Sequence, residues 1–198
     1  MSTTLAGLAR NVDAVVVGAS AGGVEILSAL LSCLPANCPA AFFIVMHIPR
    51  ERPSLLPEVF SVRCALPVKE AEDKEPVQPG TVYFAPPDYH LLLDRGPALA
   101  LSSDEPVHFS RPSIDVLFES AADIYGERLL GLILTGANQD GAAGLAAVGR
   151  AGGRTVVQDP ETAAVAYLPK AALLEGPVDY VLSPTQLQSV FAMWGPQE

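Results

Sequence analysis

The feature that most constrains the fold is an alternation of short, β-branched apolar runs with longer stretches of helical character. Glycine, proline or polar residues follow each apolar run, a pattern typical of buried parallel strands that alternate with helices. This alternation predicts a Rossmann-like α/β fold with three α/β/α layers around a mainly parallel sheet. We expect strands at residues 14–17, 41–46, 81–85, 129–134, 155–158 and 180–182, and helices at 23–34, 113–124, 142–151 and 184–193.

The stretch from 51 to 111 is less regular because it carries many of the 18 prolines. Within it, we expect the strand at 81–85 to pair with 90–93 as a hairpin at a sheet edge. A chain of 198 residues has room for one domain of ordinary size. We expect an N-terminal leader over 1–12 and a single domain over 13–195.

Charge and composition exclude several classes of partner. The formal net charge is -10, whereas nucleic-acid binders concentrate Lys and Arg on one face. No apolar run approaches the roughly 20 residues of a spanning helix, and the N-terminus lacks the pattern of a secretory signal. Cys33, Cys38 and Cys64 lack the spacing of a disulfide framework or a zinc site. We therefore expect a cytoplasmic protein without metal or cofactor, which binds no nucleic acid and does not insert into membranes.

Three polar residues with catalytic chemistry come after expected strands. Ser20 follows the first strand, His47 directly follows the second, and Asp140 follows the strand at 129–134. In an open parallel sheet, ligands bind beyond the carboxyl ends of the strands. The sequence therefore predicts that a serine, a histidine and an aspartate lie at one edge of the sheet.

Ser20 lies in a turn of small residues, Gly18-Ala19-Ser20-Ala21-Gly22-Gly23. Small neighbours leave the hydroxyl exposed and allow a substrate carbonyl to approach the backbone. The helix that follows begins with free N–H groups, so the amides of Ala21 and Gly22 are candidate donors to an oxyanion. The alternative is a turn that holds a nucleotide phosphate or only closes tightly, although Ser20 breaks the G-x-G-x-x-G pattern.

His47 and Asp140 each have a functional and a plainer interpretation. An imidazole at the sheet edge can act as base toward Ser20, and a carboxylate can orient it as the third member of a triad. The plainer interpretations are an ordinary hydrogen-bonded histidine and an aspartate that caps the helix after Gly141. The order Ser, His, Asp differs from that of α/β-hydrolases, but triads are defined by geometry. A serine hydrolase is the favoured hypothesis.

The chain resembles the catalytic domain of the bacterial chemotaxis protein-glutamate methylesterases, the CheB family, which also deamidate glutamine. The resemblance covers nearly the whole chain. Its ordered blocks are residues 18–23, 47–49, 68–73, 77–86, 111–118, 134–136, 140–142 and 152–159. It implies that Ser20 attacks a γ-glutamyl methyl ester while His47 takes the proton and Asp140 holds the ring. The implied partners are methylated cytoplasmic helices of chemoreceptors, or a related sensor protein.

Several positions depart from the family pattern. Met46 stands where the family usually has Gln, so we expect one polar contact near His47 to be missing. Ala137 and Asn138 replace Met and Gly; the resemblance implies that the Ala137 N–H still serves the oxyanion. Asn138 is expected to keep the turn because Asn tolerates left-handed backbone. Residues 50–57 replace a Phe-Thr or Phe-Ser element, so we expect an altered receptor-facing wall.

Recognition and control give two further expectations. Arg111 is a candidate for attracting an acidic receptor helix, or else an ordinary residue at the surface or the start of a helix. Classical family members carry a receiver domain before the catalytic domain, and the 12 residues ahead of Asp13 are too few for one. We therefore expect no phosphorylation gating within this chain.

Two rival functions stay open. Met46 and Ala137 leave room for a non-catalytic homologue that binds receptor helices or a methyltransferase as a scaffold. A phosphate-binding module is the second, although the net charge and the missing Walker lysine weigh against it.

Overall fold

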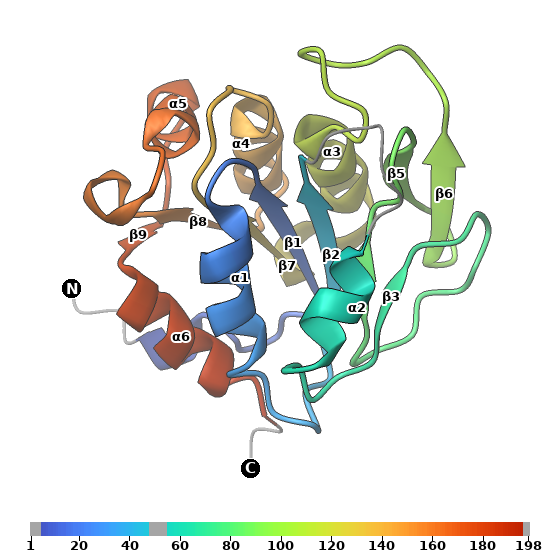
Figure 1. The fold of residues 1–198 in the computed structure, drawn as a ribbon, viewed down its shortest axis with the longest axis horizontal. Coiled ribbons are helices and arrows are strands. Elements are labelled where there is room, and N and C mark those ends of the chain that lie inside the picture. The colour runs from blue at the N-terminus through green and yellow to red at the C-terminus, as the bar shows by residue number, and fades with distance from the viewer. Residues whose placement is uncertain (1–4, 48–54, 196–198) are drawn as a thin grey trace.

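The computed structural model describes residues 5–47 and 55–195 and is built on one large parallel sheet (Figure 1). Its seven strands lie in the order β3-β4-β2-β1-β7-β8-β9, and every pairing is parallel. The strands are β1 Ala14–Ala19, β2 Ala41–Met46, β3 Val68–Glu70, β4 Val82–Phe84, β7 Leu129–Ile133, β8 Arg154–Gln158 and β9 Tyr180–Leu182. The sheet and the helices on its two faces confirm the expected α/β/α architecture.

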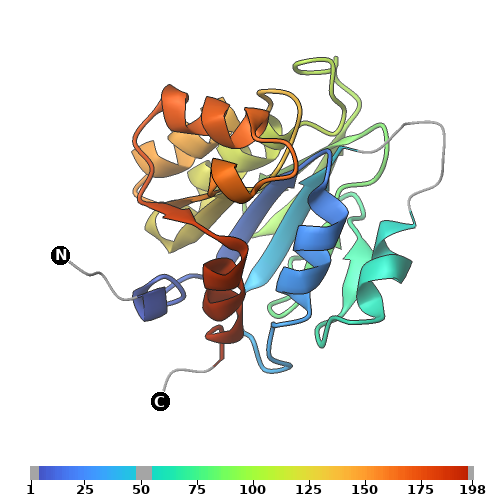
Figure 2. The ribbon, with the colours of Figure 1, turned by 60° about the vertical axis from the view of Figure 1, so that its left-hand side comes forward.

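Helices cover both faces of this sheet. One face carries α1 Gly23–Leu31, α2 Leu56–Ser61 and α6 Pro184–Ala192, and Figure 2 shows α1 and α6 side by side there. The other carries α3 Ile114–Tyr125, α4 Ala142–Arg150 and α5 Tyr167–Glu175. Short 3-10 helices are η1 Leu5–Gly7, η2 Gly126–Arg128 and η3 Pro160–Thr162. Among the helices in the described ranges, none combines the length and apolar character needed to cross a membrane.

Two hydrophobic clusters, one on each side of the sheet, explain why β1 is buried throughout. Val15 and Val17 pack into the cluster under α1 and α6, whereas Val16 packs into the cluster under α3 and α4. Because both faces are covered, the strand is a continuous apolar run rather than an alternating one. This double burial is what made the central strands visible in the sequence.

The expected hairpin between residues 81–85 and 90–93 is wrong. Strand β4 pairs in parallel with β2 and β3, and β5 His90–Asp94 pairs with β6 Ala98–Ser102 in a separate antiparallel sheet. Pro86 and Pro87 follow one residue after β4 and have no backbone N–H for a ladder, so the chain leaves the large sheet there. The small sheet instead packs on α3, where the Leu93 N–H donates to the Ser120 hydroxyl at 3.1 Å.

The register of the central strands positions the site. Ala19 of β1 lies opposite Met46 of β2, so Ser20 and His47 leave neighbouring strands at the same level. Hydrogen bonds continue past the strand ends: His47 N–H donates to the Ala19 carbonyl, and Ser20 N–H to the Thr135 carbonyl, both at 3.0 Å. The three segments that follow β1, β2 and β7 are thereby fixed against one another.

Candidate active site

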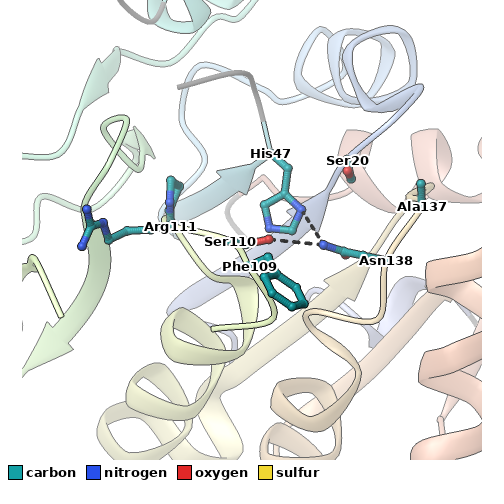
Figure 3. A pocket seen from close by; sticks show the side chains of 8 residues that line it. Ser20, His47, Phe109, Ser110, Arg111, Ala137 and Asn138 are labelled. Carbon is teal, nitrogen blue, oxygen red and sulfur yellow. Dashed lines mark hydrogen bonds between the residues drawn. The ribbon is translucent and has the colours of Figure 1, made fainter. Parts of the chain in front are cut away.

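A pocket of about 270 Å³ opens at the carboxyl edge of the sheet (Figure 3). The segments that follow β1, β2 and β7 and the loop before α3 contribute to its wall. The lining residues are Ser20, His47, Phe109, Ser110, Arg111, Pro112, Ala137 and Asn138. The structure thus brings together the serine and the histidine that the sequence placed at this edge.

Ser20 sits in a tight turn that only small residues allow. Gly22 has a left-handed backbone with φ of 79°, and a Cβ on it would lie 2.5 Å from the Cβ of Ala164. Across the turn, a Cβ on Gly136 would lie 3.0 Å from the Cβ of Ser20. The Thr135 hydroxyl fastens the turn by donating to the Ala21 carbonyl at 2.8 Å. Glycine at these two positions therefore keeps the space around the serine free.

Three exposed residues near Ser20 have backbone amides that a ligand could use. Within the described ranges, the N–H groups of Ala21, Gly22 and Ala137 donate to no protein acceptor. Ala21 and Gly22 precede the first turn of α1, whose dipole favours negative charge at that end. Their position suits an oxyanion, which agrees with the expectation for all three; their role in catalysis stays a prediction.

His47 and Asp140 form a close pair. His47 Nε2 lies 2.8 Å from Asp140 Oδ2, and the two side chains are 14% and 0% exposed. Because an ionised carboxylate only accepts, Nε2 carries the hydrogen and Nδ1 keeps its lone pair. Nδ1 has a single weak neighbour among the described residues, the Asn138 amide nitrogen at 3.5 Å. The nitrogen able to take a proton is therefore Nδ1.

Ser20 and His47 line the same pocket, but no hydrogen bond joins their side chains in the described part of the chain. Catalytic hydrogen bonds are often long without substrate and tighten when it binds. Figure 3 shows the Ser20 and His47 side chains among those that line the pocket. The arrangement can support proton transfer from the hydroxyl to Nδ1 once a substrate is seated.

Asp140 is held by the N-terminus of a neighbouring helix. Its carboxylate accepts from the Ser113 hydroxyl at 2.7 Å and from the Ile114 and Asp115 backbone N–H groups at 2.8 and 3.1 Å. Burial by itself would raise the pKa of Asp140. The hydrogen bonds from His47, Ser113 and the two amides outweigh it and lower the pKa below its usual value. Asp140 is therefore a charged partner for His47 in the folded protein.

The N-cap interpretation of Asp140 is wrong for the helix that follows it. Gly141 is the N-cap of α4 and has no side-chain cap; Asp115 of α3 accepts from the Gly141 and Gly144 amides at 2.9 and 2.6 Å. Asp115 of α3 thus caps α4, while Asp140, which lies just before α4, caps α3. Burial, with repulsion from Asp140, raises the pKa of Asp115 to about 6. The exchange fixes Asp140 relative to both helices.

Sequence reasoning missed two residues behind this pair. Ser113 is fully buried and orients Asp140, and its own backbone N–H donates to Nδ1 of His90 at 3.1 Å. His90 in turn donates through Nε2 to the Glu105 carbonyl at 3.1 Å. The loop before α3 is therefore tied to Asp140 through buried side chains. The signal for Ser113 is its place as a serine N-cap directly before an apolar periodic stretch.

Asn138 does not serve the turn as expected. Its φ is not among the positive values of the non-glycine residues, so it does not take the left-handed backbone. Instead its carbonyl oxygen accepts from the Asp140 N–H at 3.3 Å, and its amide nitrogen donates to the Ser110 hydroxyl at 3.3 Å. The side chain that replaces Gly thus braces the loop beside His47.

The other departures leave the pocket intact. The side chain of Met46 is 4% exposed and packs in the apolar cluster under α1, away from His47's side of the strand. Ala137 is an exposed residue whose backbone N–H donates to no acceptor among the described residues. Most of the altered wall expected at 50–57, namely residues 50–54, lies outside the described residues.

Arg111 lines the pocket, yet its guanidinium is engaged by protein groups. Nη2 and Nε lie 2.8 and 3.1 Å from the Asp88 carboxylate, and Nη1 donates to the Ser103 and Asp104 carbonyls at 2.7 and 3.0 Å. Figure 3 shows the group directed away from Ser20 and His47. Its expected part in attracting a receptor helix stays a prediction, while its contacts show that it ties loops together.

Comparison with known proteins gives a consistent picture. Residues 15–191 match the CheB methylesterase family. A Leptospira interrogans protein with a provisional protein-glutamate methylesterase/protein-glutamine glutaminase name is 44% identical over 91% of this chain and 94% of its own length. The Bordetella parapertussis protein-glutamate methylesterase/protein-glutamine glutaminase is 44% identical over 85% of this chain, which spans 49% of that protein. The crystal structure of the Thermotoga maritima CheB methylesterase catalytic domain superposes with a TM-score of 0.84 at 36% identity, covering 90% of this chain and 98% of that one.

Proposed function

The chain belongs to the CheB methylesterase family, and we propose that it hydrolyses γ-glutamyl methyl esters with Ser20 as nucleophile, His47 as base and Asp140 as orienting carboxylate. One observation carries the assignment of roles: Asp140 engages Nε2 of His47 at 2.8 Å, so Nδ1, which has only a weak contact with the Asn138 amide among the described residues, is the nitrogen that can take a proton beside Ser20. A base without this orientation would present the wrong tautomer.

The first half of the reaction forms an acyl-enzyme. Ser20 Oγ attacks the ester carbonyl carbon while its proton passes to Nδ1 of His47, and the Asp140 carboxylate stabilises the imidazolium through Nε2–H. The amides of Ala21, Gly22 and Ala137 are the donors for the negative charge on the carbonyl oxygen. When the tetrahedral intermediate collapses, the proton on Nδ1 moves to the departing methoxide, and methanol leaves.

The second half releases the product. A water molecule gives a proton to Nδ1 and attacks the acyl carbon, and the glutamate carboxyl leaves as His47 returns the proton to Ser20. With a glutamine side chain, the same sequence releases ammonia instead of methanol. The names of the relatives combine both activities, as a methylesterase and a glutaminase.

On this proposal, the substrates are methylated chemoreceptors, which the protein binds in the cytoplasm. Family membership supports the partner class. The features that favoured a scaffold do not disturb the site: Met46 is buried in the core and Ala137 keeps its amide. The preserved His47–Asp140 pair favours catalysis over binding alone.

Methanol release from radiolabelled, methylated chemoreceptor membranes tests the proposal. The wild-type chain should release methanol, and Ser20→Ala should reduce the rate to background. Ser28→Ala, at a half-buried serine of α1 outside the pocket, is the matched control and should retain the rate. If neither the wild type nor Ser20→Ala released methanol above background, the scaffold would be the better account, and equal release above background would rule out Ser20 as the nucleophile.

A further inference from the structure

A strained two-residue turn forms part of the pocket wall. Val107 N–H donates to the Ser110 carbonyl at 3.1 Å, and Ser110 N–H donates to the Val107 carbonyl at 2.8 Å. The residues between them, His108 and Phe109, have φ of 47° and 62°. Left-handed backbone costs a residue with a side chain about 1–2 kcal/mol, and such turns normally hold Asn-Gly or similar pairs. A bulky pair at these positions calls for a reason outside backbone geometry.

Phe109 is also the exception among the phenylalanines. The chain has seven, and six of them are at most 1% exposed: Phe42, Phe43, Phe60, Phe84, Phe118 and Phe191. Phe109 is 98% exposed and lines the same pocket as Ser20 and His47. Figure 3 shows its ring beside Ser110, facing the space below His47. Its aromatic surface is thus presented to whatever enters the site.

The turn that carries Phe109 is fixed on both sides. Ser110 accepts from the Asn138 amide at 3.3 Å, in the segment that leads to Asp140. Arg111, the next residue, is anchored to Asp88 and to two backbone carbonyls. The exposure of the ring is therefore set by a braced loop, and its position relative to His47 is preorganised.

Apolar surface continues on the other side of this turn. A groove of about 460 Å³ between α4 and α5 is lined by His108 and, along one face of α5, by Tyr167 and Leu174, which are 56% and 88% exposed. Ala142 and Ala171 also line it, together with the charged residues Asp115, Lys170 and Glu175. The surface therefore reaches well beyond the space that a single glutamyl ester side chain needs, and it suits a protein substrate.

We propose that Phe109 is a substrate-binding residue whose ring packs against an apolar side chain of the protein that bears the glutamyl methyl ester. The inference rests on the proposed function. An uncharged contact suits this enzyme because a chain of net charge -10 does not attract an acidic helix. Aromatic residues in such positions dominate many protein interfaces. Phe109 thereby selects for protein-borne esters over small ones.

The test compares a protein substrate with a small ester. Phe109→Gly removes the ring and suits the left-handed backbone, so its melting temperature should be no lower than that of the wild type. On methylated chemoreceptor membranes, its kcat/KM should fall about tenfold, mainly through a higher KM. On p-nitrophenyl acetate, the fall should be much smaller. Phe109→Tyr should restore the receptor rate, and Val62→Ala, at an 81% exposed residue outside both pockets, is the matched control.

Three results would overturn the inference. The first is a Phe109→Gly enzyme that demethylates the receptor as well as the wild type does. The second is an equal loss on both substrates, which would indicate a distorted site. The third is a change in oligomeric state on gel filtration, which would assign the ring to self-association. Failure of the proposed function looks different, because the wild type would then release no more methanol than Ser20→Ala.

Discussion

Asp140→Asn separates the two tasks of this carboxylate, which are to orient His47 and to cap α3. The aspartate accepts four hydrogen bonds, two at each oxygen: from His47 Nε2 and Ile114 N–H at Oδ2, and from Ser113 Oγ and Asp115 N–H at Oδ1. An asparagine places an NH₂ group at one of these positions. In either orientation, a buried backbone N–H of α3 loses its acceptor, which costs about 1–3 kcal/mol of stability.

The effect on catalysis should be larger than the effect on stability. With the NH₂ group toward His47, the ring must accept through Nε2 and carry its hydrogen on Nδ1, so it can no longer take a proton from Ser20. Loss of the correct tautomer lowers kcat by about 10⁴-fold in triads of this kind. Methanol release measures kcat, and urea unfolding measures the free energy of unfolding.

Asp115→Asn is the matched control because it changes the other buried aspartate of the same helix pair. Both amides that Asp115 caps donate to one oxygen, which an asparagine carbonyl can replace. This variant should keep its esterase activity. A loss of less than about tenfold in kcat for Asp140→Asn corresponds to less than about 1.4 kcal/mol in the activation free energy. That result would show that His47 does not depend on Asp140 for its tautomer.

Three further predictions concern the pKa of Asp115, the packing of Gly136 and the burial of Met46. In the folded protein, the pKa of Asp115 is raised from 3.8 to about 6, so the folded state binds the proton more tightly. The free energy of unfolding should therefore fall as pH rises from about 4 to 6, by at most about 3 kcal/mol, and Asp115→Asn should flatten this slope in urea titrations; an unchanged slope would refute the assignment. Gly136→Ala should lower both the melting temperature and methanol release, since its Cβ would meet Leu168 at 2.8 Å and Ser20 at 3.0 Å; a stable, fully active variant would contradict that packing. Met46→Gln should lose about 1–3 kcal/mol in urea unfolding because its amide would enter an apolar cluster, and unchanged stability would show that a polar partner exists.

The central sheet was predictable because its strands are buried on both faces. Strands β1, β2 and β7 read as uninterrupted apolar runs, and turn residues mark their ends. The elements that escaped prediction lack such contrast. Strand β3 has three half-buried residues. Helix α5 contains Pro169, and its apolar residues do not gather clearly on one face. The hairpin prediction failed because it paired two runs that are close in sequence and gave too little weight to the two prolines between them.

The positions of Ser20, His47 and Asp140 followed from one rule about the carboxyl ends of parallel strands. Their immediate partners did not, because those partners arise from packing between distant segments. Nothing local indicates that Asp140 caps α3, whose N-cap is Ser113, while Asp115 caps α4. Sequence patterns favour a cap on the nearest helix, whereas in the structure each aspartate caps the more distant helix.

The covalent intermediate gives the most direct test of the central claim, that Ser20 carries the glutamyl group during methyl ester hydrolysis. A rapid-quench reaction with a methylated chemoreceptor fragment, followed by proteolysis and mass spectrometry, locates the acylated residue. We predict a glutamyl-linked receptor peptide on Ser20 that is absent from Ser20→Ala. Methanol release by the wild type with no adduct on Ser20, or with an adduct on another residue, would contradict the account.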